Sequence, residues 1–218
     1  MQPEFWHDRW RTGQIGFHQT AVDRHLEQHW PGFGLAHNSR AFVPLCGKSL
    51  DLKWLLERGH FVTGVDLSAV ALESFCMEQG IPARRRTLRA FEVYETSDLN
   101  LYCGDFFALT RDLVGPIAAV YDRAALISWS PELRPRYVAH AATLTLPGTQ
   151  TLLITLEYPQ PQMPGPPFSV SADDVERLYS DNHSIRELSK DDILASEPRL
   201  RSRGLTQLHE VCYRLTRL

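Results

Sequence analysis

The chain has 218 residues, of which 43% are hydrophobic and 22% charged, and its 23 basic and 26 acidic side chains give a formal charge of −3. This composition is typical of a globular protein and excludes a disordered chain, which would be poor in apolar residues and strongly charged. The slightly acidic balance also argues against nucleic-acid binding, which needs a dense basic surface.

The first predicted element is a helix, because Trp6 and Trp10 are four residues apart and would share one helix face. A second helical pattern covers residues 22–30 and ends at the breakers of residues 31–34. We therefore expect a helical N-terminal cover over residues 1–38.

His25 and His29 in the second helix are also four residues apart, a spacing that metal ligands can use. Their order is His-Leu-Glu-Gln-His, which is not the metalloprotease motif. A solvated helix face is the expectation here, and no metal is predicted.

From residue 40 onward, short apolar runs alternate with helical patterns. The expected strands are residues 41–45, 61–65, 99–103, 117–121 and 151–156, with helices that begin near Ser49, Ser68 and Pro131. Such alternation implies βαβ crossovers and a mostly parallel sheet. The tail differs, since residues 185–188 and 208–215 predict two more strands with no clear long helix, which would form an antiparallel edge. The sequence thus predicts a doubly wound α/β fold with seven strands.

The segment Pro159–Phe168 contains five prolines and one glycine, so it is predicted to be a stiff surface loop. A role in covering a site and a role as a plain connector are equally open for it. The basic run Arg84–Arg86 predicts a solvated surface. We expect one domain, 1–218, with a core over residues 39–158 and a loop and sheet edge over residues 159–218.

No run of about 18 apolar residues predicts a membrane span, and no apolar segment near the N-terminus predicts a secretory signal. The four cysteines are scattered, without the clustered spacing of disulfide or zinc frameworks. Reduced thiols in a cytoplasmic protein are therefore expected.

The strongest local signal is the run from Phe42 to Ser49, which reads as a strand, a tight turn and a helix start. Ligands of open α/β sheets lie beyond the carboxyl ends of the strands, and Gly47 would let the backbone approach one closely. The run has one glycine where dinucleotide-binding turns have three, so it is equally compatible with a simple connection.

Asp66 strengthens the interpretation, because it ends the second strand about 20 residues after the turn, where nucleoside-binding sheets place an acid for the ribose hydroxyls. Asp105 and Phe106 follow the third strand and suit an adenine ring, with an Asx turn and a core phenylalanine as the alternative. Arg123 ends the fourth strand, where it would hold an anion or form a structural ion pair.

Together these residues resemble the thiopurine S-methyltransferases, especially their shorter bacterial members. The resemblance runs from Trp6 to Leu215 and rests on these segments: Trp6 and Trp10, residues 16–19, 42–49, 52–55, 64–68, 101–103, Asp122-Arg123 and 165–168. In vertebrate members, the acid at position 66 is Glu, and the Asp-Arg pair is followed by Gly where this chain has Ala124.

The resemblance implies a class I methyltransferase fold with a Rossmann-like sheet. The implied cofactor is S-adenosylmethionine, with S-adenosylhomocysteine as product. The residues implied or expected to bind this cofactor are Trp10, Leu45, Gly47, Asp66, Asp105, Phe106 and Arg123.

The resemblance also suggests a substrate pocket formed by Phe17, His18, Arg123, Phe168 and Arg199. The arginines would stabilise a thiolate, Trp10 and Phe17 would exclude water, and no general base is obligatory. His18 is open as a proton acceptor or a structural residue.

The expected reaction is methyl transfer to aromatic or heterocyclic thiols, extending to selenium or tellurium compounds. The expected partner is a small molecule, bound by a monomer without nucleic acid or membrane. Two alternatives stay open at this stage: an NAD-dependent oxidoreductase, disfavoured by the missing glycines, and a non-catalytic nucleoside-binding protein.

Overall fold

The computed structural model describes residues 3–218, and the chain forms two compact units whose boundary lies between Tyr121 and Asp122. The expectation of one domain with three regions stays a prediction. Among the described residues, no helix is long and apolar enough to cross a membrane.

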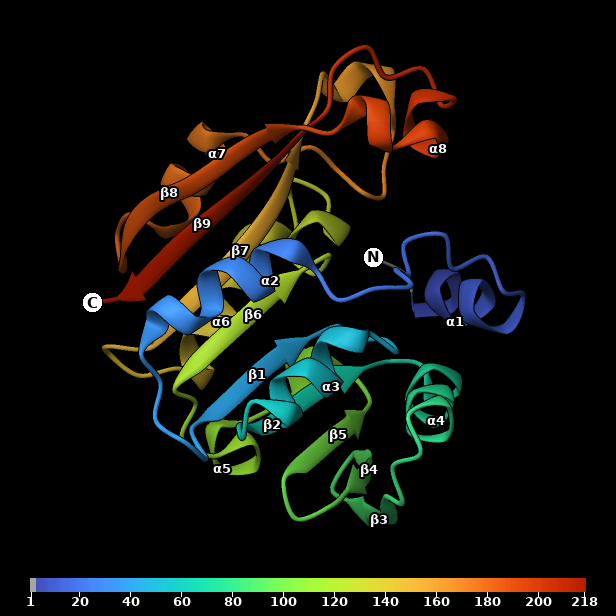
Figure 1. Cartoon of the computed structure of the whole chain (residues 1–218), viewed down its shortest axis with the longest axis vertical. Coiled ribbons are helices and arrows are strands. Elements are labelled where there is room, and N and C mark those ends of the chain that lie inside the picture. The colour runs from blue at the N-terminus through green and yellow to red at the C-terminus, as the bar shows by residue number, and fades with distance from the viewer. Residues whose placement is uncertain (1–2) are drawn as a thin grey trace. The chain divides into compact units, whose positions relative to one another are not determined.

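The first unit combines helices with parallel and antiparallel strands of a sheet (Figure 1). Its helices are α1 (Pro3–Arg11), α2 (Arg24–His29), α3 (Leu50–Glu57), α4 (Ala69–Glu78) and α5 (Arg111–Val114). Its strands are β1 (Arg40–Pro44), β2 (Phe61–Asp66), β3 (Arg84–Leu88), β4 (Phe91–Glu95), β5 (Leu99–Cys103) and β6 (Ala119–Arg123), whose last two residues belong to the second unit.

These strands lie in the order β3-β4-β5-β2-β1-β6. β1 pairs in parallel with β2 and β6, and β2 pairs in parallel with β5, as the βαβ pattern predicts. The central strand β2 is buried over Val62–Val65, because helices pack on the sheet. Its carboxyl end and that of β1 point the same way, so the turns that follow both strands are neighbours.

β3 and β4 are additional to the seven strands expected from the sequence. They form an antiparallel hairpin that pairs with β5 through β4. Arg84 and Arg85 are exposed, as expected, but they belong to a strand. Three consecutive arginines hide a strand pattern, and charged side chains suit the edge of a sheet because they discourage pairing with another chain.

The N-terminal helices are where the sequence places them, but the histidines of α2 are not on a solvated face. His25 is 1% exposed, and its ring stacks on that of His29 with 5.9 Å between centroids. Asp23 caps the helix by accepting the N–H groups of His25 and Leu26, which draws this turn into the core. The expectation of a solvated face is therefore wrong for His25.

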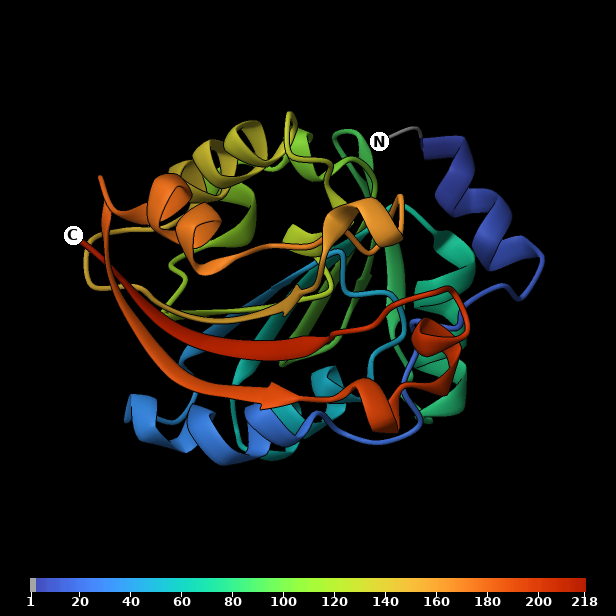
Figure 2. The same ribbon diagram turned by 90° about the horizontal axis from the view of Figure 1, so that it is seen from above.

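The second unit combines helices with strands that pair antiparallel (Figure 2). Its elements are the 3₁₀ turn Leu126–Ser128, α6 (Arg134–Leu144), β7 (Gln150–Glu157), α7 (Ala172–Tyr179), β8 (His183–Asp192), α8 (Pro198–Arg201) and β9 (His209–Arg217). β9 lies between β7 and β8 and pairs antiparallel with both, as expected of the tail.

The helix α7 is absent from the predicted elements. Ser171 and Asp174 form a capping box at its start, in which the Ser171 side chain accepts the Asp174 N–H and the Asp174 carboxylate accepts the Ser171 N–H. The proline-rich segment is mainly a loop, as predicted, but it includes a short 3₁₀ turn at Gln160–Gln162. All four cysteines are free thiols.

Candidate active site

The turn after β1 has an unusual backbone. Leu45 and Gly47 both have positive φ angles, 49° and 52°, while the Cys46 N–H donates to Val65 O at 3.0 Å and continues the ladder with β2. A leucine in this region is strained, and such strain concentrates where a site requires a fixed backbone. The turn is therefore shaped by more than chain reversal.

Asp66 is the last residue of β2, and its carboxylate bonds to this turn. Its Oδ2 accepts the Gly47 N–H at 2.9 Å, and its Oδ1 accepts the Ser68 N–H at 2.9 Å. Burial raises the pKa of the Asp66 carboxyl to about 6, although the N–H groups of Ser68 and Gly47 lower it. The glycine turn and the strand-end acid, predicted separately, are thus joined in one hydrogen-bonded unit.

Trp10 of α1 closes against the same turn. A Cβ atom at Gly47 would lie 2.9 Å from Trp10 Cζ2, so only glycine accommodates the indole at this distance. Trp10 is 8% exposed, and its ring meets Phe17 edge-on at 5.6 Å between centroids. Phe17 also packs edge-on against Trp6 at 5.5 Å.

This aromatic cluster, Trp6, Trp10 and Phe17, connects α1 with the loop that follows it. The next residue, His18, donates its backbone N–H to Ile15 O at 2.7 Å. Of the predicted residues in the first unit, Trp10, Phe17, Gly47 and Asp66 are therefore linked by direct contacts or by one intermediate residue.

Asp105 and Phe106 form the Asx turn and the core phenylalanine that were the alternative to adenine binding. Asp105 is exposed and accepts the Phe107 N–H at 2.9 Å, which caps a 3₁₀ turn. Phe106 is 4% exposed and stacks on Phe42 in the core. The less buried ring here is that of Phe107, which the sequence did not single out.

Two polar anchors of this region are also absent from the predicted site. Lys48 forms an ion pair with Glu78 of α4 at 2.7 Å, with its side chain only 15% exposed. Asp51 is 1% exposed and accepts the Asp23 N–H at 2.8 Å and the Tyr121 hydroxyl at 3.0 Å. These partners are 28 and 70 residues away, so no local motif signals them.

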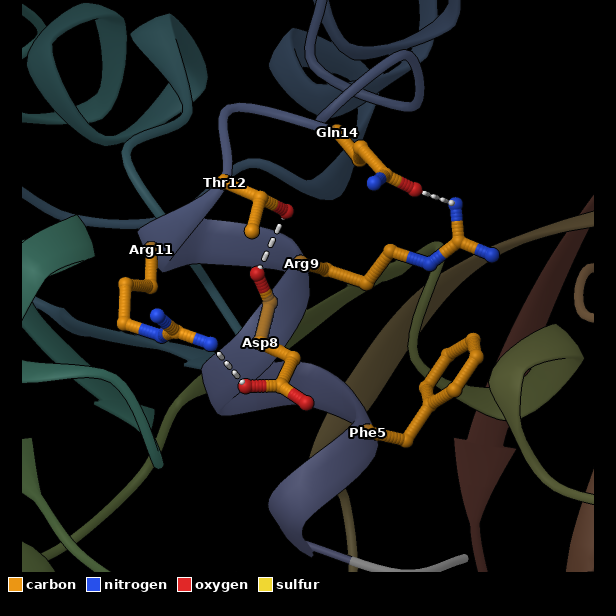
Figure 3. A pocket seen from close by; sticks show the side chains of 6 residues that line it. All are labelled: Phe5, Asp8, Arg9, Arg11, Thr12 and Gln14. Carbon is orange, nitrogen blue, oxygen red and sulfur yellow. Dashed lines mark hydrogen bonds and ion pairs between the residues drawn. The ribbon is translucent and has the colours of Figure 1, made fainter.

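A separate cavity of about 230 Å³ lies along α1 (Figure 3). Its lining residues are Phe5, Asp8, Arg9, Arg11, Thr12 and Gln14. The polar groups satisfy one another: Arg11 pairs with Asp8 at 2.9 Å and Arg9 donates to Gln14 at 3.2 Å. It contains none of the predicted site residues.

In the second unit, Arg123 ends β6 beside a buried acid. Asp122 is 3% exposed and accepts the Leu126 N–H at 3.0 Å and the Tyr137 hydroxyl at 2.7 Å. Burial raises the pKa of the Asp122 carboxyl to about 6, against the effect of these bonds. Ala124 follows with a positive φ of 62°.

Phe168 and Arg199 belong to two segments that share one hydrophobic cluster of the second unit. Its buried members are Tyr158, Met163, Leu200, Leu205 and Leu208. Tyr158 donates its hydroxyl to Pro167 O at 2.6 Å, next to Phe168, while Arg199 is exposed on α8 beside Leu200. The cluster therefore joins the proline-rich loop to α8.

Comparisons with known proteins agree with this architecture. A solved methyltransferase from Burkholderia thailandensis, bound to S-adenosylhomocysteine, has a TM-score of 0.63 at 15% identity and covers 98% of this chain and 87% of its own. The magnesium protoporphyrin IX methyltransferase from Synechocystis, also with bound S-adenosylhomocysteine, has a TM-score of 0.64 at 13% identity, with 99% of both chains covered.

The sequence comparisons are more specific. The family model of thiopurine S-methyltransferase matches residues 1–218. The thiopurine S-methyltransferase of Pseudomonas fluorescens is 46% identical over 99% of both chains. That of Methylococcus capsulatus is 46% identical over 98% of this chain and 96% of its own.

The structural neighbours confirm the predicted α/β class, and the fold is that of the class I S-adenosylmethionine-dependent methyltransferases. Within this class, the full-length match is decisive: the chain belongs to the thiopurine S-methyltransferase family and is an S-adenosylmethionine-dependent S-methyltransferase. The oxidoreductase and the non-catalytic alternatives are not supported.

Proposed function

We propose that this enzyme transfers the methyl group of S-adenosylmethionine to the sulfur of aromatic or heterocyclic thiols by in-line displacement. The observation that carries the proposal is the pairing of the Asp66 carboxylate with the Gly47 N–H, 2.9 Å apart, after two adjacent parallel strands. This pairing offers a carboxylate for ribose hydroxyls at the carboxyl ends of two parallel strands, where ligands of open α/β sheets lie.

The chemistry of these residues fits the cofactor. A carboxylate has about four acceptor positions, and the two N–H bonds to Asp66 leave others for the ribose hydroxyls. When bound, S-adenosylmethionine supplies a methyl group that its sulfonium sulfur has already activated. We assign Leu45 and Gly47 to the backbone wall of this site and Asp105 to the adenine amino group.

The aromatic cluster is assigned to the exclusion of water. Trp10 covers the Gly47 turn and is itself held by Phe17. Removing water strengthens the electrostatic interactions of the remaining groups and protects the nucleophile from solvation. Phe106 acts indirectly in this assignment, since its ring supports the adenine side from the core.

Arg123 and Arg199 are assigned to the substrate. A soft sulfur nucleophile attacks as the thiolate, and guanidinium groups stabilise that anion. Phe168 supplies an apolar wall for an aromatic ring, and Arg123 also contributes to cofactor binding. A thiol that is ionised in solution needs no general base. We therefore assign His18 as a proton acceptor only for less acidic thiols, which bind in the protonated form.

The proposed substrates extend to selenium and tellurium compounds, since these elements share the soft, polarisable character of sulfur. Thiopurines are synthetic, so other thiols or these compounds are proposed as the natural substrates. We further propose that the enzyme acts as a monomer in the cytoplasm, without a nucleic-acid or membrane partner.

The test is a methyl-transfer assay with isotopically labelled S-adenosylmethionine and thiophenol, mercaptopurine, selenite or tellurite, followed by mass analysis of the products. We expect labelled methyl on sulfur for the aromatic thiols, and a rate that falls in Arg123→Ala and Arg199→Ala. Absence of methyl transfer to every thiol, with the cofactor bound, would contradict the proposal.

A further inference from the structure

The backbone around Phe168 is fixed from both sides. Its own N–H donates to Ile127 O at 2.7 Å, and the preceding Pro167 O accepts the Tyr158 hydroxyl at 2.6 Å. The following Ser169 donates its N–H to Gln160 Oε1 at 2.9 Å. Because these bonds fix the peptide groups before and after Phe168, they also fix the direction of its side chain.

Arg134 completes this set from the start of α6. Its Nε donates to Trp129 O at 3.2 Å and its Nη2 donates to Ser169 O at 2.7 Å. Trp129 follows the 3₁₀ turn that contains Ile127, the acceptor of the Phe168 N–H. One guanidinium therefore joins the two backbone segments between which Phe168 is held.

The same side chain reaches the start of α7. Arg134 Nη1 lies 3.8 Å from Asp174 Oδ2, the carboxylate of the capping box, which also accepts the Ser171 N–H at 3.0 Å. Ser171 is two residues after Ser169, so the contact with Asp174 fixes the far end of the loop as well. Only arginine can make these divergent contacts, because its donors are spread over a rigid planar fork.

The burial of the Arg134 guanidinium carries a desolvation free energy that a purely structural side chain would avoid. The residue is 2% exposed, and a buried guanidinium must be compensated by charge and hydrogen bonds. Its closest acceptors are two neutral carbonyl oxygens, and the acidic partner is at a longer distance. An apolar side chain would fill such a position at lower cost but would not fix the loop.

We propose that Arg134 is a positioning residue that sets the Phe168 wall of the substrate pocket and thereby determines the affinity for aromatic thiols. The proposal rests on the proposed function, in which Phe168 contacts the thiol ring. Arg134 itself does not contact substrate or cofactor. Its effect is therefore specific to thiol binding and leaves the Asp66 site unaffected.

The test compares Arg134→Lys with Arg136→Lys, an exposed arginine in the same helix. Lysine keeps the charge but cannot reach two divergent carbonyls, so we expect the KM for thiophenol to rise about tenfold at saturating cofactor, the equivalent of one lost charge-assisted hydrogen bond. The kcat should change less than about threefold, and the dissociation constant of S-adenosylmethionine, measured by calorimetry, should stay unchanged. Arg136→Lys should match the wild type in all three quantities.

A second variant covers the case in which Arg134→Lys does not fold. Tyr158→Phe keeps the ring in the hydrophobic cluster and removes the two bonds of the hydroxyl, the one it donates to Pro167 O at 2.6 Å and the longer one it accepts from Gln160 Nε2 at 3.4 Å. We expect it to raise the KM for thiophenol in the same direction, and more than the KM for an aliphatic thiol, because only the aromatic ring packs on Phe168.

The outcomes separate the two proposals. If the wild type transfers no methyl to thiols, the proposed function and this inference both fail. If the wild type is active and folded Arg134→Lys shows an unchanged KM, or weakens cofactor binding equally, only the positioning role is overturned. An unchanged aromatic-to-aliphatic KM ratio in Tyr158→Phe would overturn it as well.

Discussion

Asp66 Oδ2 accepts the backbone N–H of Gly47 at 2.9 Å, and this bond joins the residues that follow β1 and end β2. The two residues are 19 apart in sequence. The same carboxylate accepts the Ser68 N–H at the start of α4, so one side chain orients both the turn and the helix. Ionisation of Asp66 is therefore coupled to the geometry of the turn and of the start of α4.

This coupling predicts a pH dependence of cofactor binding. Burial raises the pKa of Asp66 to about 6, and only the carboxylate form can accept both ribose hydroxyls. Binding should therefore be unaffected well above pH 6 and weaken as the pH falls. At pH 5 about a tenth of the carboxyl is ionised, so the apparent dissociation constant of S-adenosylmethionine should rise about tenfold.

Calorimetric titrations between pH 5 and pH 8 measure this effect. In Asp66→Asn, binding should be weaker by about 1–3 kcal/mol at pH 8 and nearly independent of pH. Asp112→Asn, at an exposed position on α5, should keep the wild-type profile. The same pH slope in Asp66→Asn and wild type would assign the titration to another group.

Gly47→Ala should disrupt the turn by steric contact with Trp10. The new Cβ would lie 2.9 Å from Trp10 Cζ2, and the alanine would have to adopt a φ of 52°. Gly80→Ala is a matched control, because Gly80 has a φ of 63° but no atom within 4 Å of its Cβ position. We expect both variants to lose about 1 kcal/mol of stability from the backbone, and only Gly47→Ala to weaken cofactor binding at least tenfold. Equal affinity in the two variants would show that Trp10 does not constrain the turn.

The parallel part of the fold was predictable because its strands are short apolar runs with helix caps between them. The run Ala41–Leu45 and the caps Ser49 and Ser68 are local signals that the tertiary structure reinforces. β3 lacks such a signal, because three consecutive arginines give no alternation of apolar and polar residues. Arginines of this run instead pair with acidic side chains, as Arg86 does with Glu95 of β4. α7 was missed although its capping box is visible in the sequence, because the proline-rich loop before it masked the pattern.

Within the candidate site, the proximity of two residues was predictable where the residue type has a direct chemical meaning, as for the glycine of the turn and the acid at position 66. It was not predictable where the role depends on distant partners. Asp51 meets Tyr121 across 70 residues, and Arg134 meets Ser169 across 35. The strained φ of Leu45 is likewise a property of the folded turn, since leucine itself does not indicate it.

Ala124→Gly is expected to stabilise the second unit. Ala124 has a φ of 62°, which costs an alanine about 1–2 kcal/mol, whereas glycine adopts this conformation freely. The greater flexibility of glycine in the unfolded chain opposes this gain by about 0.4–1 kcal/mol, so the net increase in the free energy of unfolding should be about 0.5–1 kcal/mol. Urea denaturation measures it, with Ala139→Gly in α6 as the opposite control, expected to lose about 1 kcal/mol. A decrease in Ala124→Gly would contradict the prediction.

Asp122 predicts a second effect of pH, on stability. Burial raises the pKa of its carboxyl from 3.8 to about 6, so the folded state disfavours the charge that the unfolded chain already carries above pH 4. The stability contributed by the protonated carboxyl is complete below 3.8 and lost as the pH rises through 6. Asp122→Asn removes the charge and keeps an oxygen for the Leu126 N–H, so its free energy of unfolding should exceed that of the wild type by about 1–3 kcal/mol at pH 8. In urea titrations the difference should shrink toward pH 4, while the exposed Asp181→Asn should show none. A gain that is constant with pH would mean that packing around Tyr137, and not the buried charge, limits stability at this position.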